Sequence, residues 1–140
     1  MGWLYTFKTI HYLGIILLAG NITVTGTGSG SFQGIETLNA GNLIGGGSGS
    51  IELIADEINL ISGTVQSTGP LTIRPLTPST PIGIGGPVAT LEIGDTELSN
   101  LSPGFSSITI GDIASGTGAV TVGSSAFQDD VTIAGGNIDV

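Results

Sequence analysis

Short triplets of apolar, polar and apolar residues recur along the chain from Asn21 to its last residue. In most of them the apolar positions hold Ile, Val or Leu. Successive side chains of a strand point to opposite faces, so each triplet predicts a short β-strand with one apolar face. The clearest triplets are residues 22–24, 51–53, 58–60, 71–73, 91–93, 108–110, 120–122, 131–133 and 138–140.

The spacing of apolar residues does not favour helices. No window combines a sustained i, i+3, i+4, i+7 pattern with residues that favour helix formation. The nearest candidate, residues 54–61, also fits two strands joined by a corner at Ala55, Asp56 and Glu57. We therefore predict an all-β chain with very little helix.

Glycine-rich corners separate the triplets. An antiparallel sandwich would also show short strands at regular intervals. A sandwich usually carries Asn-Gly or Asp-Gly hairpins and an aromatic core, whereas this chain lacks both dipeptides and is 5% aromatic. Thin layers of Ile, Val and Leu suit stacked coils better, so we predict a right-handed parallel β-helix (β-solenoid) over residues 21–140. With roughly 20 residues in each coil, residues 21–140 would form about six coils.

Proline interrupts this rhythm within residues 75–87, which contain Pro75, Pro78, Pro81 and Pro87. Proline has no N–H to donate to a strand ladder, so this segment predicts a Pro-rich loop that leaves the coil. Ile82 and Ile84, which lie among glycines, would return the chain to the stack.

Residues 1–20 differ from the rest. They hold the only Trp, His11 and Lys8, followed by the apolar run 12–20. A positive residue, a short apolar run and small residues occur in this order in secretory signals. The run is shorter than the about 18 apolar residues of a membrane span. Two other interpretations stay open: an apolar strand or cap leading into the coils, and a start codon inside a longer reading frame.

The charge and the cysteine content of the chain exclude several classes of function. The chain has 11 acidic residues against Lys8 and Arg74, for a net charge of −9. Binding to nucleic acid requires clustered Lys and Arg, so we expect no nucleic-acid partner. The chain has no cysteine, which excludes disulfides and thiolate metal sites.

Acidic pairs are the only candidates for a metal. Asp129 with Asp130, and Asp56 with Glu57, are weak candidates for surface calcium, because hard cations prefer oxygen ligands. Solvated turn acids are the alternative interpretation. In the glycine-rich segment 46–53, Ile51 stands where calcium-binding β-roll repeats need Asp. No other metal or cofactor is expected.

Catalysis is not predicted. An acid/base pair needs carboxylates that converge with separated pKa values. Asp95, Glu97 and Asp112 are scattered along the sequence, Arg74 is the only cation of the body, and His11 lies in the first segment. The glycine-rich stretches do not complete a phosphate-binding motif.

Threonine takes the middle position of several triplets. Stacked in neighbouring coils, these residues would form a regular polar array like that of ice-binding solenoids, although Thr is also a favoured exposed strand residue. Glu52, Asn59, Glu92 and Asp139 interrupt the series. The threonines are Thr23, Thr72, Thr109, Thr121 and Thr132.

One segment, residues 68–86, resembles a unit of very large bacterial exoproteins similar to filamentous-haemagglutinin-type adhesins and autotransporter passengers. The resemblance continues through residues 91–93, 97–98, 104–111, 116–122 and 130–136. It implies a right-handed β-helix, export through the outer membrane, and display or release at the cell surface. It carries no catalytic residues. The chain is far shorter than such exoproteins and lacks their secretion-recognition and translocator domains. A second interpretation is therefore that it is a fragment of a larger gene.

From these observations we predict a structural or adhesive β-helix segment, extracellular or at the bacterial cell surface, that is not an enzyme. Its partners would be host-surface or matrix glycans or proteins, and its coil ends would self-associate. The alternatives are a carbohydrate-binding or polysaccharide-cleaving β-helix and a non-functional fragment.

Overall fold

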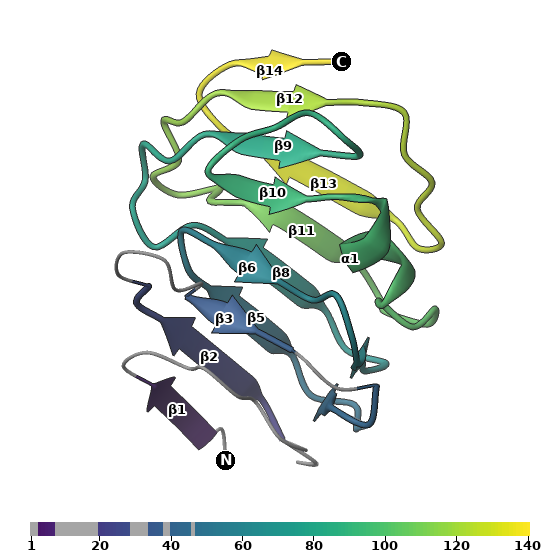
Figure 1. Ribbon diagram of the computed structural model, residues 1–140. Helices are drawn as coiled ribbons and strands as arrows, with labels where there is room; N and C mark the ends of the chain where they lie inside the picture. Colours follow the sequence, from purple (N-terminus) through teal and green to yellow (C-terminus); the bar gives the residue numbers. More distant parts are fainter. Residues whose placement is uncertain (1–2, 8–19, 29–33, 38–39, 46) are drawn as a thin grey trace.

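The computed structural model describes residues 3–7, 20–28, 34–37, 40–45 and 47–140. It consists of short strands in stacked sheets, with one short helix among the described residues (Figure 1). The elements are β1 (Trp3–Phe7), β2 (Ile22–Gly26), β3 (Ile35–Glu36), β4 (Leu43–Gly45), β5 (Ile51–Ile54), β6 (Ile58–Asn59), β7 (Thr64–Gln66), β8 (Leu71–Arg74), β9 (Ile82–Ile84), β10 (Leu91–Ile93), α1 (Asp95–Ser99), β11 (Ile108–Gly111), β12 (Val120–Val122), β13 (Val131–Ala134) and β14 (Ile138–Asp139).

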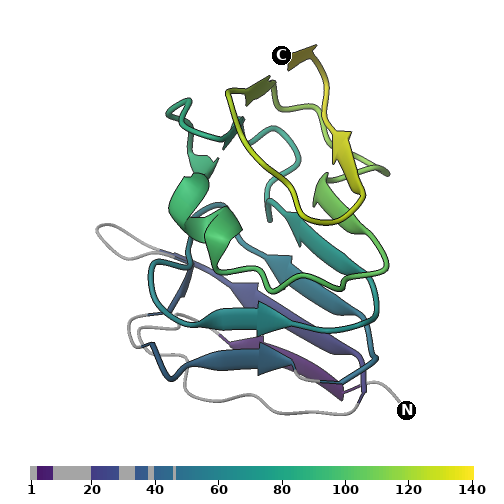
Figure 2. The same ribbon diagram turned by 90° about the vertical axis from the view of Figure 1, so that its right-hand side faces the viewer.

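All strand pairs of the described residues are parallel. The largest sheet has six strands in the order β1-β2-β5-β8-β11-β13. The opposite side holds the pair β3-β6 and the four-stranded sheet β10-β9-β12-β14, and a further pair, β4-β7, completes the set. The stack rises from the N-terminal strand to the C-terminal strand (Figure 2). The prediction of a mostly β chain with parallel sheets and almost no helix is confirmed.

The triplet pattern accounts for the register of the six-stranded sheet. Ile51 of β5 pairs with Leu71 of β8, and Leu71 pairs with Ile108 of β11, so apolar residues align from strand to strand. Two positions further along, Leu53, Ile73 and Ile110 align in the same way, and all three are buried. Burial of such aligned side chains is the main stabilising contribution to the stack.

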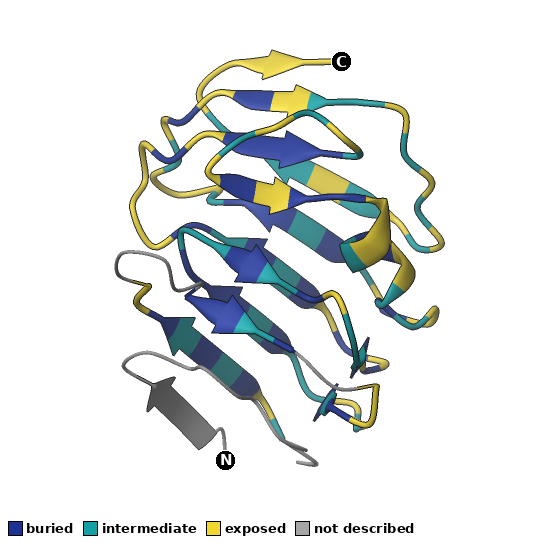
Figure 3. Ribbon diagram, viewed as in Figure 1, coloured by how far each residue is buried: buried dark blue, intermediate teal, exposed yellow. Residues whose placement is uncertain are grey.

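Burial decreases toward the C-terminal strands (Figure 3). Ile110 of β11 is fully buried, whereas Val131 and Ile133 of β13 are only half-buried against the same core. Both residues of β14 are exposed. The last strands therefore cover the core on one side and leave their own inward side chains in part open to water.

The range 75–87 holds more than a loop, because strand β9 lies inside it. Residues 75–81 leave β8 as expected of a proline-rich segment. Ile82 and Ile84 then bring the chain back into a sheet, and both are buried. This return was expected from Ile82 and Ile84, although the middle position of the strand is Gly83 rather than a polar residue.

An unusually short connection, residues 85–90, joins the parallel strands β9 and β10. Parallel neighbours normally need a crossover of a dozen or more residues. Here Gly85 and Gly86 have positive φ values of 68° and 109°, which turn the chain back sharply. The connection then crosses the face of β9 at Gly83, where a Cβ atom would meet the Pro87 carbonyl oxygen. β10 consequently lies between β9 and β6 (Figure 1).

The first segment is described only in part. Residues 3–7 form β1, which pairs with β2 in parallel register. The apolar run that suggested a secretory signal, residues 12–20, lies outside the described residues except for Gly20. Across the part of the chain that the structure covers, no helix has the length and hydropathy needed to traverse a membrane.

Candidate functional site

The Asp129 carboxylate, a predicted calcium candidate, holds a turn of the chain. It accepts hydrogen bonds from the Gly104 N–H, at 3.0 and 3.1 Å from its two oxygens, and from the Phe105 N–H at 3.1 Å. Asp130 is exposed, and its carbonyl accepts the Ile108 N–H at 2.8 Å. In the described residues no three His, Cys, Asp or Glu side chains are grouped to hold a metal ion. Calcium binding therefore stays a prediction, and the Asp129 carboxylate serves to anchor the turn at Gly104 and Phe105.

Asp56, from the second predicted pair, connects two neighbouring corners. Its carboxylate accepts the Thr77 N–H and the Thr77 hydroxyl, both at 2.7 Å, and the Thr80 hydroxyl at 2.8 Å. Partial burial raises the pKa of Asp56, but these hydrogen bonds together outweigh burial and lower the pKa below its ordinary value of 3.8. Asp56 thus fixes the proline-rich segment to the preceding corner.

Replacing Asp56 with alanine is expected to lower the free energy of unfolding by about 1–2 kcal/mol at neutral pH, because two hydroxyls and one N–H lose a charged acceptor. A carboxyl with a lowered folded-state pKa stabilises the fold above its unfolded pKa. That contribution disappears as the pH falls below 3.8 through the folded-state value. Urea unfolding between pH 7 and about pH 2 should show the wild type and the variant converging in acid. Asp139→Asn, at an exposed position, is the control; a difference independent of pH would contradict this account.

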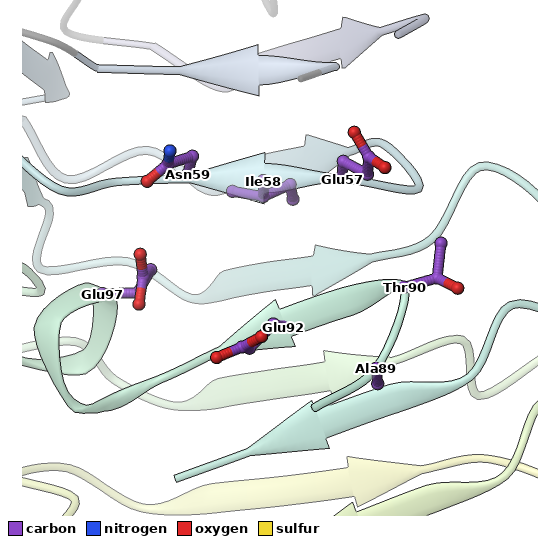
Figure 4. Close-up of a pocket in the computed structure, with 7 residues that line it drawn as sticks. All are labelled: Glu57, Ile58, Asn59, Ala89, Thr90, Glu92 and Glu97. Atoms are coloured by element: carbon purple, nitrogen blue, oxygen red, sulfur yellow. The ribbon is translucent and has the colours of Figure 1, made fainter. Parts of the chain in front are cut away.

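An acidic groove lies between β6 and β10 (Figure 4), with a volume of about 340 Å³. These neighbouring strands share no ladder. The Glu57 and Asn59 carbonyls accept hydrogen bonds from the β3 side, so the backbone groups of Ile58 face β10. The groove is therefore a break between two sheets. Its lining residues are Glu57, Ile58, Asn59, Ala89, Thr90, Glu92 and Glu97.

The carboxylates of this groove do not meet at one point. Figure 4 shows Glu57 near one end and Glu97 near the other, with Glu92 between them. The Glu97 carboxylate accepts the Gly94 N–H at 3.1 Å, at the start of α1. Sequence reasoning considered Glu97 together with Asp95 and Asp112, which line other parts of the surface. Glu57 was considered only as a calcium candidate together with Asp56, and Glu92 was missed. Only the step back from β9 to β10 brings Glu92 beside β6.

The outward face of the six-stranded sheet carries the predicted threonine array in part. Its middle row runs Thr23, Glu52, Thr72, Thr109 and Thr132, each paired with the next across the ladder. Thr121 belongs to the other side of the molecule, where it pairs with Gly83 and Asp139. The array thus has four threonines in one row, interrupted once by Glu52.

Beside this row lies an open depression of about 470 Å³. On its floor Arg74 Nε donates to Glu52 Oε1 at 2.7 Å, and the two side chains are 30% and 34% exposed. One wall is the turn that follows β11, in which Asp112 accepts the N–H groups of Ala114 and Ser115 and the Ser115 hydroxyl. The pKa of Asp112 is lowered, chiefly by the Ser115 hydroxyl. The depression therefore contains both signs of charge together with hydroxyl groups.

Comparison with known proteins adds no relative. The chain matches no family model, no curated protein and no solved structure. The resemblance to large bacterial exoproteins therefore rests on the residues quoted for it above.

Proposed function

We propose that the chain is a segment of a right-handed β-helix of about six coils, a structural or adhesive element of a secreted or surface-displayed bacterial exoprotein. The observation that supports it most is the unbroken register of six parallel strands. In that register apolar rows face inward and a polar row faces outward. Each strand covers the apolar side chains of its neighbour. The polar face is therefore held rigid even though the chain has few charged and few aromatic residues.

The experiment for this function is localisation on intact cells that carry the gene. An antibody against the purified chain should label whole cells or detect the protein in the medium, and added protease should remove the label. Protein confined to the cytoplasmic fraction would overturn the proposal. If the protein is missing from every fraction while its transcript is present, the non-functional fragment is the better description.

The C-terminal edge of the stack is expected to drive self-association. In β13, pairing with β11 uses the backbone groups of Asp130 and Thr132, so those of Val131 and Ile133 point to the free edge. A free edge beside half-buried apolar side chains is a template for another strand. Analytical ultracentrifugation should therefore show association that grows with protein concentration.

Two variants test whether this edge is responsible. Ile133→Lys places a charge on the inward side of the edge strand and should reduce association. Thr132→Lys, next in sequence but outward-facing, is the matched control and should leave association in place. Circular dichroism checks that both variants fold. A wild-type chain that stays monomeric at all concentrations would show that the edge is not adhesive.

A carbohydrate-cleaving β-helix is the second candidate, because the groove between β6 and β10 gathers Glu57, Glu92 and Glu97 on one surface. Two carboxyl groups at suitable separation are the usual apparatus of glycoside hydrolysis. Release of reducing ends from polysaccharides, lost in Glu92→Gln and retained in Asp139→Asn, an exposed acid outside the groove, would establish this activity. If no reducing ends are released, the cleaving function is ruled out and the structural or adhesive function is retained.

A further inference from the structure

The depression on the six-stranded sheet offers hydrogen-bonding groups that no other described residue engages. Arginine has five N–H donors. Among the hydrogen bonds of the described residues, the Arg74 side chain uses only Nε, toward Glu52. The hydroxyls of Thr72 and Thr109, which are each donor and acceptor, have no partner within the described part of the chain either. The floor therefore presents donors and acceptors side by side, an arrangement that matches pairs of hydroxyl groups on a ligand.

Charge selects against ionic ligands at this place. Arg74 is already paired with Glu52, and Asp112 on the wall adds a second negative charge. With a net charge of −9, the chain repels anions. A cationic group would be attracted by the net negative charge but would meet the Arg74 guanidinium on the floor, which offsets that attraction. A neutral ligand rich in hydroxyls has neither penalty.

The threonine row gives the ligand a direction. Neighbouring parallel strands lie about 4.8 Å apart, so the hydroxyls of Thr72 and Thr109 repeat at that interval along the stack. This interval is close to the length of one pyranose residue in an extended glycan. A linear polysaccharide lying across the strands would thus place successive sugars over Thr72, Thr109 and Thr132. Ile113, which lines the depression and is 72% exposed, offers an apolar contact for the C–H face of a sugar ring.

We propose that the outward row from Glu52 to Thr132 is a binding track for a linear neutral polysaccharide, anchored at the Arg74 depression. The proposal rests on the proposed display function, for which it names the adhesive face and the class of ligand. Since each sugar makes only a few solvent-exposed hydrogen bonds, affinity comes from repetition along the track and increases with the length of the glycan.

The test is calorimetric titration of the purified full chain with the neutral cello-, malto- and fully N-acetylated chito-oligosaccharides of two and six residues, and with hexagalacturonate as an anionic probe. We expect at least one neutral hexasaccharide to bind, and to bind about tenfold or more tighter than its disaccharide. Arg74→Ala, and the double variant Thr72→Val with Thr109→Val, should each weaken that binding about tenfold or more, since each removes two or more hydrogen bonds.

Thr121→Val is the matched control, because Thr121 is an exposed strand threonine on the opposite side of the molecule. Binding should be unchanged in it, and circular dichroism should show that all variants fold. The proposal is overturned if no neutral oligosaccharide binds, if hexagalacturonate binds more tightly, or if binding survives the Thr72 and Thr109 changes. Surface localisation is measured independently on cells, so failure here and failure of the display function are distinguishable.

Discussion

Replacing Gly83 with alanine is expected to destabilise the chain by about 3 kcal/mol or more, which is at the severe end for one added methyl group. The Cβ atom would meet the Pro87 carbonyl oxygen, a backbone atom that cannot move without lifting the connection 85–90. Backbone hydrogen bonds hold that connection in place on both sides of Gly83. The Leu91 N–H donates to the Pro81 carbonyl at 3.1 Å, and the Gly85 N–H donates to the Ile93 carbonyl at 2.9 Å. Shifting the connection strains both hydrogen bonds.

The measurement for Gly83 is urea unfolding followed by circular dichroism. Gly41→Ala is the control, because a Cβ at Gly41 would meet no heavy atom of the described residues within 4 Å and the residue is exposed. It should change the free energy of unfolding by no more than about 0.5 kcal/mol. If Gly83→Ala were as stable as Gly41→Ala, the connection would not cross β9 as described.

Truncating Ile73 to alanine should lower the free energy of unfolding by about 3–4 kcal/mol. Ile73 is fully buried and lies between Leu53 and Ile110 in an inward row, so the lost methyl groups leave a cavity inside the stack. Neighbouring strands are held in register by their ladders and cannot collapse to fill it. The free energy of unfolding from urea titration measures this loss.

Thr72→Ala, one residue earlier on the same strand, provides the comparison. Thr72 is on the outward side of β8 and only half-buried, so its truncation should change the free energy of unfolding by about 0.5 kcal/mol or less. Equal losses in the two variants would mean that the inward and outward faces are assigned wrongly.

The strands with apolar-polar-apolar triplets could be predicted from sequence alone, because the alternation that marks them is local. Each triplet overlaps a strand, for example residues 71–73 with β8 and residues 120–122 with β12, although β6 and β14 are one residue shorter than their triplets. The corner at 55–57 was also predicted, with strands β5 and β6 on either side. The inward positions follow directly, since burial and alternation agree in β8 and β10.

Elements that depend on distant partners were predicted only in part or missed. The return of Ile82 and Ile84 to the stack was expected, but not the crossing of their strand by the connection that follows it. β9 has glycine where a triplet has a polar residue, and that glycine is required by Pro87, which crosses it. The two-residue strand β3 is too short for any periodicity to show. The groove between β6 and β10 could not be predicted either, because it arises from the order of β9 and β10 in the sheet and not from any spacing of its glutamates.

The step back from β9 to β10 has a geometrical consequence for any longer rod that contains it. Between the level of β5 with β6 and the level of β11 with β12, one side of the stack holds a single strand, β8, whereas the other holds both β10 and β9. With one extra strand spacing of about 4.8 Å, the second side is the taller one. The stack is therefore wedge-shaped and its axis bends toward the six-stranded sheet. Repetition of such a unit would turn a straight rod into an arc with the threonine row on its concave side.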